Sequence, residues 1–277
     1  MSKANAIKTF RDLLSFLTII PLAETEDFVF TSARNMYLFS LMGGLIGVFG
    51  AGYFLISGFI VSYLFMAINS LIQIPIGLLL QAIPAVMTLA FLLVFTGFQH
   101  FDGLVDLGNA VGLKKVEDRR EIAHRWVVTY KGALLAMIVE FSAVAGLFLL
   151  SSNIAVRALI VAEVTAKLAM VTIVWRGKAA HQGLGSRFIG NAKRPLNYVA
   201  YGVAFLIGYV LLGYFGLLLV VSSILLGLFM EQVGKSVFGG VSGDMIGATN
   251  EAARALTLLL VALILTIGLP ILSGALI

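Results

Sequence analysis

The chain lacks cysteine altogether and is poor in charged residues. With no cysteine among 277 residues, disulfides, thiolate metal sites and cysteine nucleophiles are all excluded. Only 12% of the residues are charged, whereas a soluble domain carries about 25%. Hydrophobic residues make up 60% of the chain, and the mean hydropathy is +1.02. These values exclude a water-soluble globular domain.

Charge is also missing from long continuous stretches. Residues 36–98 contain no Asp, Glu, Lys or Arg. A helix needs about 20 apolar residues to cross roughly 30 Å of hydrocarbon, and the alternating pattern of a membrane β-barrel is absent. The sequence therefore predicts an all-α, polytopic transmembrane helical bundle, a single integral membrane domain over residues 1–277. Its spans are expected within residues 36–98, 133–175, 198–230 and 255–277.

The number of spans depends on the third apolar segment. The first segment has room for two spans with a turn near Asn69, Gln73 and Pro75, and the second for two that meet at Ser151 to Asn153. The third holds either two short spans with a turn around Gly213 to Gly216 or one long tilted span. Two short spans give about seven in all and bring every charged loop to one face. We favour seven, because a single span would separate the carboxylates of the last loop from the others.

The distribution of basic residues predicts the orientation. Seventeen of the 19 Lys and Arg residues lie in the N-terminal segment and the three loops; Arg157 and Lys167 are the exceptions. The positive-inside rule makes that face cytoplasmic and the protein a multi-pass protein of the cell membrane. Such loops also explain the net charge of +5 without a nucleic-acid partner. The expected parts are an N-terminal interfacial helix and loop (1–34) and cytoplasmic loops 99–131, 176–195 and 231–254.

The first candidate site begins directly after an apolar segment, at His100. Asp102 and Asp106 are four residues apart, so on a helix their carboxylates share one face. Oxygen ligands without cysteine indicate a hard cation such as Mg²⁺, which takes one or two carboxylates plus substrate phosphate. Asn109, one turn further on, offers a carbonyl oxygen. The alternative is a solvated, negatively charged helix start.

The second candidate is the glycine-rich segment 239–251. Gly240 and Gly243 allow the backbone to approach a ligand closely, and Asp244 and Glu251 supply two further carboxylates. The alternative is that these glycines serve close helix packing.

The remaining charged groups have simpler explanations. Arg176, Lys178 and Arg187 suit a phosphate ligand, although the positive-inside bias alone predicts a basic loop. Charges inside spans must pair or face a polar interior. Glu163 and Lys167 stand at i and i+4, and we favour a structural ion pair.

The motifs resemble those of the cobalamin synthases, also called adenosylcobinamide-GDP ribazoletransferases. Residues 97–110 match the family pattern G-x-x-H-x-D-G-x-x-D-x-x-D-G up to its last two positions, where Asn109 and Ala110 replace Asp and Gly. Residues 239–248 are similar to G-G-x-[ST]-G-D-x-[LI]-G-A. Weaker matches at 16–21, 43–47 and 183–185 extend the resemblance over nearly the whole chain.

The resemblance implies a polytopic membrane enzyme that requires Mg²⁺. It would join adenosylcobinamide-GDP to α-ribazole or its 5′-phosphate and release GMP. Its partners are these substrates and the lipid bilayer, with a homo-oligomer left open. We expect catalytic roles for Asp102, Asp106, Asp244 and His100, the last as base, ligand or orienting group. The expected metal ligands are Asp102, Asp106, Asn109 and Asp244. Substrate is expected to contact Arg176, Lys178, Arg187, Gly240, Gly243, Lys167 and Glu251.

Two other functions are ranked lower. A CDP-alcohol phosphotransferase also uses clustered aspartates and Mg²⁺, but its motif requires Ala-Arg where this chain has Asp106 after Asp102-Gly-Leu-Val. A transporter would use the intramembrane charges Glu140, Glu163 and Lys167, yet no repeated halves are visible in the sequence.

Overall fold

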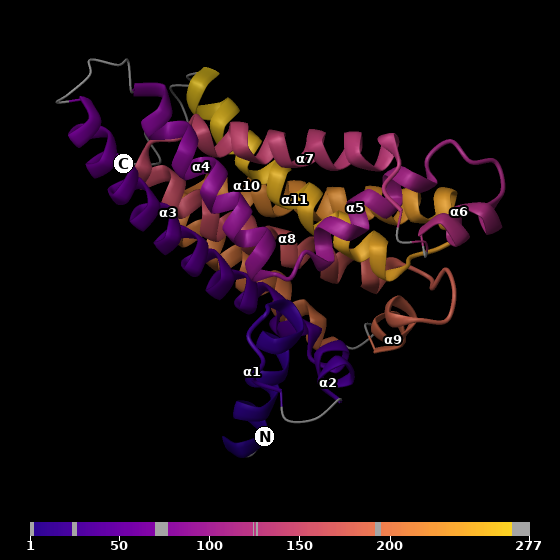
Figure 1. Cartoon of the computed structure of the whole chain (residues 1–277). Helices are drawn as coiled ribbons and strands as arrows, with labels where there is room; N and C mark the ends of the chain where they lie inside the picture. Colours follow the sequence, from indigo (N-terminus) through magenta and orange to yellow (C-terminus); the bar gives the residue numbers. More distant parts are fainter. Residues whose placement is uncertain are drawn as a thin grey trace.

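The protein is a bundle of long helices (Figure 1). The computed structural model describes residues 3–23, 27–69, 77–123, 125, 127–191 and 195–267. The helices in these ranges are α1 (Lys3–Leu17), α2 (Phe28–Arg34), η1 (Met36–Leu38), α3 (Phe39–Asn69), α4 (Gly77–Phe95), α5 (Gln99–Ala110), α6 (Val116–Ala123), α7 (Tyr130–Phe148), α8 (Ser152–Arg176), α9 (Leu184–Asn191), η2 (Pro195–Asn197), α10 (Tyr198–Phe238) and α11 (Gly243–Ile267).

Six helices in the described part of the chain are long and apolar enough to cross a membrane: α3, α4, α7, α8, α10 and α11. This confirms the all-α, multi-pass architecture. The expected turn at Ser151 to Asn153 is present, because α7 ends at Phe148 and α8 begins at Ser152. In the first apolar segment α3 ends at Asn69, whereas Gln73 and Pro75 lie outside the described residues.

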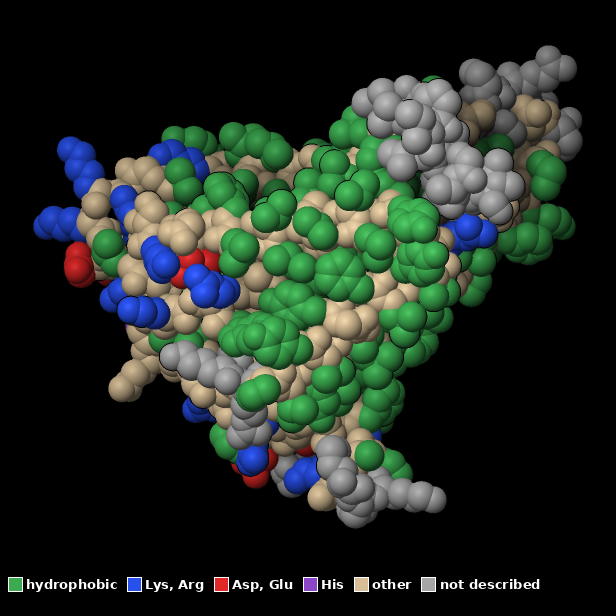
Figure 2. Space-filling model, turned by 180° about the vertical axis from the view of Figure 1, so that it is seen from behind, with side chains coloured by type: hydrophobic (Ala, Val, Ile, Leu, Met, Phe, Trp, Pro, Cys, Tyr) green, Lys and Arg blue, Asp and Glu red, His purple; other side chains and the backbone are tan. Residues whose placement is uncertain are grey.

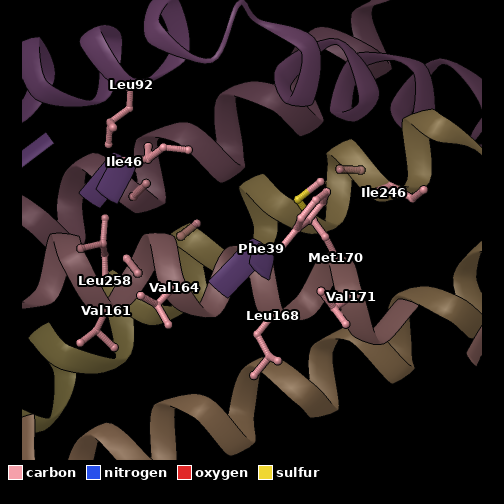
Figure 3. Close-up of a cluster of buried hydrophobic side chains, with 14 of the residues drawn as sticks. Phe39, Ile46, Leu92, Val161, Val164, Leu168, Met170, Val171, Ile246 and Leu258 are labelled. Carbon is pink, nitrogen blue, oxygen red and sulfur yellow. The ribbon is translucent and has the colours of Figure 1, made fainter. Parts of the chain in front are cut away.

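Helix α8 forms the centre of the bundle, packed against α3, α10 and α11. Most of its side chains from Ala155 to Val174 are buried. Figure 3 shows ten labelled members of the apolar core, contributed by α3, α4, α8 and α11. This core fixes the relative positions of the four helices.

Helix α10 is a hairpin of two antiparallel arms. At Gly213 the backbone has φ 58° and ψ −145°, a conformation that glycine adopts without a steric penalty. A β-carbon at Gly216 would overlap the carbonyl oxygen of Gly208. Residues eight apart in a straight helix are about 12 Å apart along the axis, so this contact requires a reversal between them. The turn lies at Leu212 and Gly213, beside the region predicted from the sequence.

Contacts with α8 show the two arms side by side. Thr172 of α8 lies 2.9 Å from the hydroxyl of Tyr201 in the first arm. A β-carbon at Gly227, in the second arm, would lie 2.8 Å from the Thr172 β-carbon. The chain therefore returns to the side from which it entered. If the two arms are counted as separate spans, the total agrees with about seven. The reversal also brings residues 231–254 beside the other charged loops.

We expect Gly216→Val to destabilise the protein by about 3 kcal/mol, because the added side chain overpacks the contact between the arms. The matched control is Gly202→Val in the first arm, where a β-carbon meets no atom within 4 Å. Thermal unfolding in detergent compares the two. Equal melting temperatures for both variants would contradict the hairpin.

The surface divides into an apolar band and a charged end. In Figure 2 hydrophobic side chains cover the face seen from behind, while Lys and Arg gather at the left edge and the bottom. The left edge corresponds to the end formed by α5, α6 and α9 in Figure 1. Helix α6 is fixed there by Arg119 and Arg120, which donate hydrogen bonds to the carbonyl oxygens of Ser236 and Phe238 at the end of α10.

Helix α1 lies beside the bundle with one face buried. Leu13, Leu14 and Leu17 are buried, while Ile7 and Phe10 are exposed. The interfacial position of residues 1–34 and the division into loops stay predictions.

Candidate functional site

The charged end is organised by a close crossing of α5 and α11. A β-carbon at Gly103 would overlap the backbone oxygen of Asp244, and one at Gly247 would lie 3.1 Å from the α-carbon of His100. Only glycine permits this approach of two helix backbones. The crossing brings the central motif of α5 against the first turn of α11, so residues about 140 positions apart form one site.

Three aspartates line one cavity at this crossing. Asp102, Asp106 and Asp244 surround a space of about 340 Å³ together with Arg125. Asp102 is exposed, Asp244 is half-buried and Asp106 is buried. Burial, with the nearby Asp244 and then Asp102, raises the pKa of Asp106 to about 7. Crowded carboxylates of this kind favour a bound cation. The structure therefore brings together the three aspartates expected from the sequence.

The spacing of the carboxylates limits how a metal could be held. Within the described ranges, no group of three or more His, Cys, Asp or Glu side chains is arranged to hold one ion. Mg²⁺ usually takes only one or two carboxylates and completes its shell with water and substrate phosphate. We call the cavity lined by Asp102, Asp106 and Asp244 the carboxylate cavity. Its oxygen donors fit that requirement.

A second cavity also includes Asp244 in its lining. It has a volume of about 300 Å³, and we call it the aromatic cavity. It is lined by Phe16, Gln99, His100, Met170, His181, Gln182, Gly183, Leu184, Phe188, Gly243, Asp244, Ile246 and Gly247. Asp244 is thus shared by both cavities.

His100 is a buried member of the aromatic cavity. Its Nε2 atom has no hydrogen-bond partner among the described residues. Burial lowers the pKa of His100 well below its usual value, and the positive charges of Lys167 and Arg254 lower it further. The imidazole is therefore neutral at pH 7 and has one ring nitrogen free for a ligand.

Asn109, an expected metal ligand, is held by hydrogen bonds to the segment before α7. Its Oδ1 accepts hydrogen bonds from the Thr129 backbone N–H at 2.9 Å and from the Thr129 hydroxyl at 2.7 Å. Its Nδ2 donates to the Val127 carbonyl at 2.8 Å. The amide oxygen accepts two hydrogen bonds in this arrangement, so the side chain ties α5 to the start of α7. A role of Asn109 as a metal ligand stays a prediction.

We expect Asn109→Asp to change the Mg²⁺ requirement by less than threefold and to destabilise the protein by about 1–3 kcal/mol. The new carboxylate oxygen would face the Val127 carbonyl and leave it unsatisfied. Melting temperature and the Mg²⁺ concentration for half-maximal activity measure the two effects. A strong gain in Mg²⁺ affinity would instead identify position 109 as a ligand.

The glycine-rich and basic loops pack on each other. Residues Ala179 and Val241 form a short parallel bridge, with hydrogen bonds of 2.7 and 3.0 Å on either side. A β-carbon at Gly240 would lie 2.6 Å from the Lys178 carbonyl oxygen. Gly240 therefore serves packing, whereas Gly243 lines the aromatic cavity.

The three basic residues expected at the substrate lie around the site rather than in either cavity. The side chains of Lys178 and Arg187 are exposed on the loop and on α9. Arg176 borders a separate cavity beside Trp175 and Tyr201. Neither cavity described above includes these three side chains in its lining.

Lys167 and Glu251 lie beneath the site in a buried ionic network. Lys167 Nζ contacts Glu163 Oε2 at 3.3 Å and donates to Asn250 Oδ1 at 2.7 Å. Arg254 Nε contacts Glu163 Oε1 at 2.5 Å, and its Nη1 pairs with Glu251. These five side chains are at most 1% exposed. The expected Glu163–Lys167 pair is present, and the network joins α8 to α11 below His100.

Several site residues had no role in the sequence analysis. None of them occupies a defined position in a recognisable motif. They are Arg125 of the carboxylate cavity and Gln99, His181 and Gln182 of the aromatic cavity. His181 and Gln182 lie in a glycine-rich part of a basic loop, and this position is the only feature of the sequence that could have indicated a role in the site.

The fold and the site define a class: a polytopic membrane protein with clustered carboxylates beside an aromatic cavity. The family model described as cobalamin-5-phosphate synthase matches residues 9–262. The chain belongs to this family, as the sequence motifs predicted.

Curated relatives agree over nearly the full length. The three relatives described next carry the name adenosylcobinamide-GDP ribazoletransferase. The protein from Escherichia coli is 30% identical over 91% of this chain and 98% of its own. The proteins from Methanocella arvoryzae and Methanococcoides burtonii are 29% and 26% identical, over 90% and 92% of this chain and 93% and 92% of their own. No solved structure matches the chain significantly.

Proposed function

We propose that this protein transfers the phospho-cobinamide unit of adenosylcobinamide-GDP to α-ribazole or α-ribazole 5′-phosphate, a late step of cobalamin biosynthesis. The observation that carries the proposal is the convergence of Asp102, Asp106 and Asp244 on one cavity, from the two motifs typical of the family. Phosphoryl transfer depends mainly on positioning the reactants and on stabilising charge. The clustered carboxylates can do both by holding a cation.

The reaction exchanges one phosphorus–oxygen bond for another. A ribose hydroxyl oxygen of α-ribazole forms a bond to the phosphorus attached to cobinamide, and the bond from that phosphorus to the oxygen bridging to GMP breaks. GMP leaves with the bonding electrons. The hydroxyl proton passes to Asp244, which faces both cavities and so can reach a nucleophile that approaches from the aromatic side.

Asp102 and Asp106 would hold Mg²⁺ in the carboxylate cavity. When bound, Mg²⁺ neutralises the diphosphate and the charge that develops on the leaving group. Arg125, in the same cavity, supports that neutralisation. Lys178 and Arg187 attract the anionic substrate from the loop surface.

We place this end of the molecule in the cytoplasm. Lys and Arg gather at the end that carries the site (Figure 2), and cytoplasmic loops carry an excess of these residues. Two of the three charges that a transporter would use do not favour that alternative, because Glu163 and Lys167 are fully buried and Glu163 pairs with both Lys167 and Arg254 of α11.

The test is GMP release by the purified full chain given adenosylcobinamide-GDP and α-ribazole phosphate, with Mg²⁺ or with EDTA. We expect release and a cobalamin product only with Mg²⁺. Absence of release in both conditions from folded protein would contradict the proposed function, and equal release in EDTA would contradict the metal assignment alone.

A further inference from the structure

The aromatic cavity has the walls of a site for a flat apolar group. Phe16 of α1 and Phe188 of α9 lie with ring centroids 5.0 Å apart and both line it. Met170 of α8 and Ile246 of α11, both labelled in Figure 3, complete the apolar lining. Aromatic rings and a thioether favour contact with another aromatic system.

One carboxylate, that of Asp244, lines the aromatic cavity together with a few other polar side chains. Gln99, His181 and Gln182 lie at its edge, and the free Nε2 of buried His100 belongs to its wall. The lining includes no Lys or Arg, so it offers no group that would neutralise a diphosphate. Small-molecule sites typically combine such apolar walls with a few polar groups that orient the ligand.

The size of the cavity also restricts its occupant. A volume of about 300 Å³ stands at the lower end of the range for small-molecule sites. It suits one nucleoside and is far too small for a corrin ring with its substituents. Asp244 lines both this space and the carboxylate cavity, so a nucleoside held here with its ribose at Asp244 would present the ribose toward the diphosphate.

We propose that the aromatic cavity binds the acceptor nucleoside, with the benzimidazole of α-ribazole against the Phe16–Phe188 pair and its ribose toward Asp244. This inference rests on the proposed function. The free Nε2 of His100 orients the ribose or the base by a hydrogen bond. Guanine, the other nucleobase of the reaction, is disfavoured because its polar edge needs several partners and its diphosphate needs cations.

The proposal also gives α9 and α1 a function. Helix α9 supplies Leu184 and Phe188, and α1 supplies Phe16, although neither helix is among the candidate spans. They therefore act as the elements that select the acceptor.

The test places a larger side chain at the edge of the aromatic cavity. Leu184 is 45% exposed, so Leu184→Trp is tolerated by the fold and narrows the space. We expect the KM for α-ribazole to rise about tenfold while the KM for adenosylcobinamide-GDP changes less than twofold. The matched control is Leu196→Trp, at a 53% exposed position outside both cavities, which should alter neither KM. Gln182→Ala, a smaller change at an exposed residue, should raise the KM for α-ribazole about threefold.

The outcomes separate this inference from the proposed function. A selective rise in the KM for adenosylcobinamide-GDP would assign the cavity to guanosine and overturn the proposal, as would unchanged KM values in Leu184→Trp. Calorimetric titration of α-ribazole into the wild type and Leu184→Trp needs no turnover. Weaker binding to the variant supports the acceptor site even where GMP release fails, and equal or absent binding overturns it.

Discussion

Asp106→Asn is expected to reduce GMP release at least about a hundredfold, the loss typical of removing one electrostatic contact made to a transferring group. Asp106 lies on the buried side of the carboxylate cavity, where water cannot replace its charge. The amide keeps the size of the side chain, so the fold is retained. Asp102→Ala should show a comparable loss. Release is measured by chromatography at saturating substrates.

The same variant should be more stable than the wild type when Mg²⁺ is absent. Burial and two neighbouring carboxylates raise the pKa of Asp106 from 3.8 to about 7, so ionisation opposes folding. The penalty is absent below about pH 4, grows as the pH rises to about 7 and is constant above that value. At pH 8 in EDTA the Asp106→Asn variant should melt several degrees above the wild type, and near pH 4 the two should coincide.

The matched control is Asp118→Asn on α6, where the carboxylate is exposed and outside both cavities. It should keep its activity and its melting temperature. Substantial activity in both Asp102→Ala and Asp106→Asn would exclude the metal assignment. A lower melting temperature for Asp106→Asn at pH 8 would show that the carboxylate is already compensated by another group.

Arg254→Met is expected to destabilise the protein by about 3–5 kcal/mol, the cost of breaking a buried ion pair. Removal of the guanidinium leaves Glu163 and Glu251 buried with only Lys167 to balance them. The loss should appear as a large drop in melting temperature in detergent. Because the network lies directly beneath His100, activity should fall with it.

Arg157→Met controls for the loss of an arginine, since Arg157 is exposed on α8, and should leave the melting temperature unchanged. The double variant Arg254→Met/Glu163→Gln removes one unpaired carboxylate and should recover part of the loss. No recovery would show that packing of the long side chain, rather than charge, accounts for the effect.

Local features of the fold could be predicted from the sequence because they depend on short spacings. The apolar segments gave the long helices, and the glycines near position 213 indicated the reversal within α10. Asp102 and Asp106 do share a helix, and the Glu163–Lys167 pair at i and i+4 is present. Each of these follows from helix periodicity within one segment.

The unpredicted features all depend on which distant segments meet. Arg254 contacts Glu163 across 91 positions, and no periodicity within α8 or α11 records that pairing. The amide of Asn109 is bound by Thr129, 20 positions further along the chain. The contacts of Gly103 and Gly247 between α5 and α11 bring the aspartates together, and no spacing within either segment indicates them.

The hairpin in α10 has a consequence for how the chain enters the bilayer during synthesis. Its first arm, before the turn at Leu212, has about 14 residues and a length of about 21 Å, which is less than the hydrocarbon thickness of roughly 30 Å. An isolated segment of this length partitions poorly from the translocation machinery into lipid. We therefore expect the arm to insert together with its longer neighbour as a folded pair, so that residues 231–254 join the other charged loops only after both arms have been made.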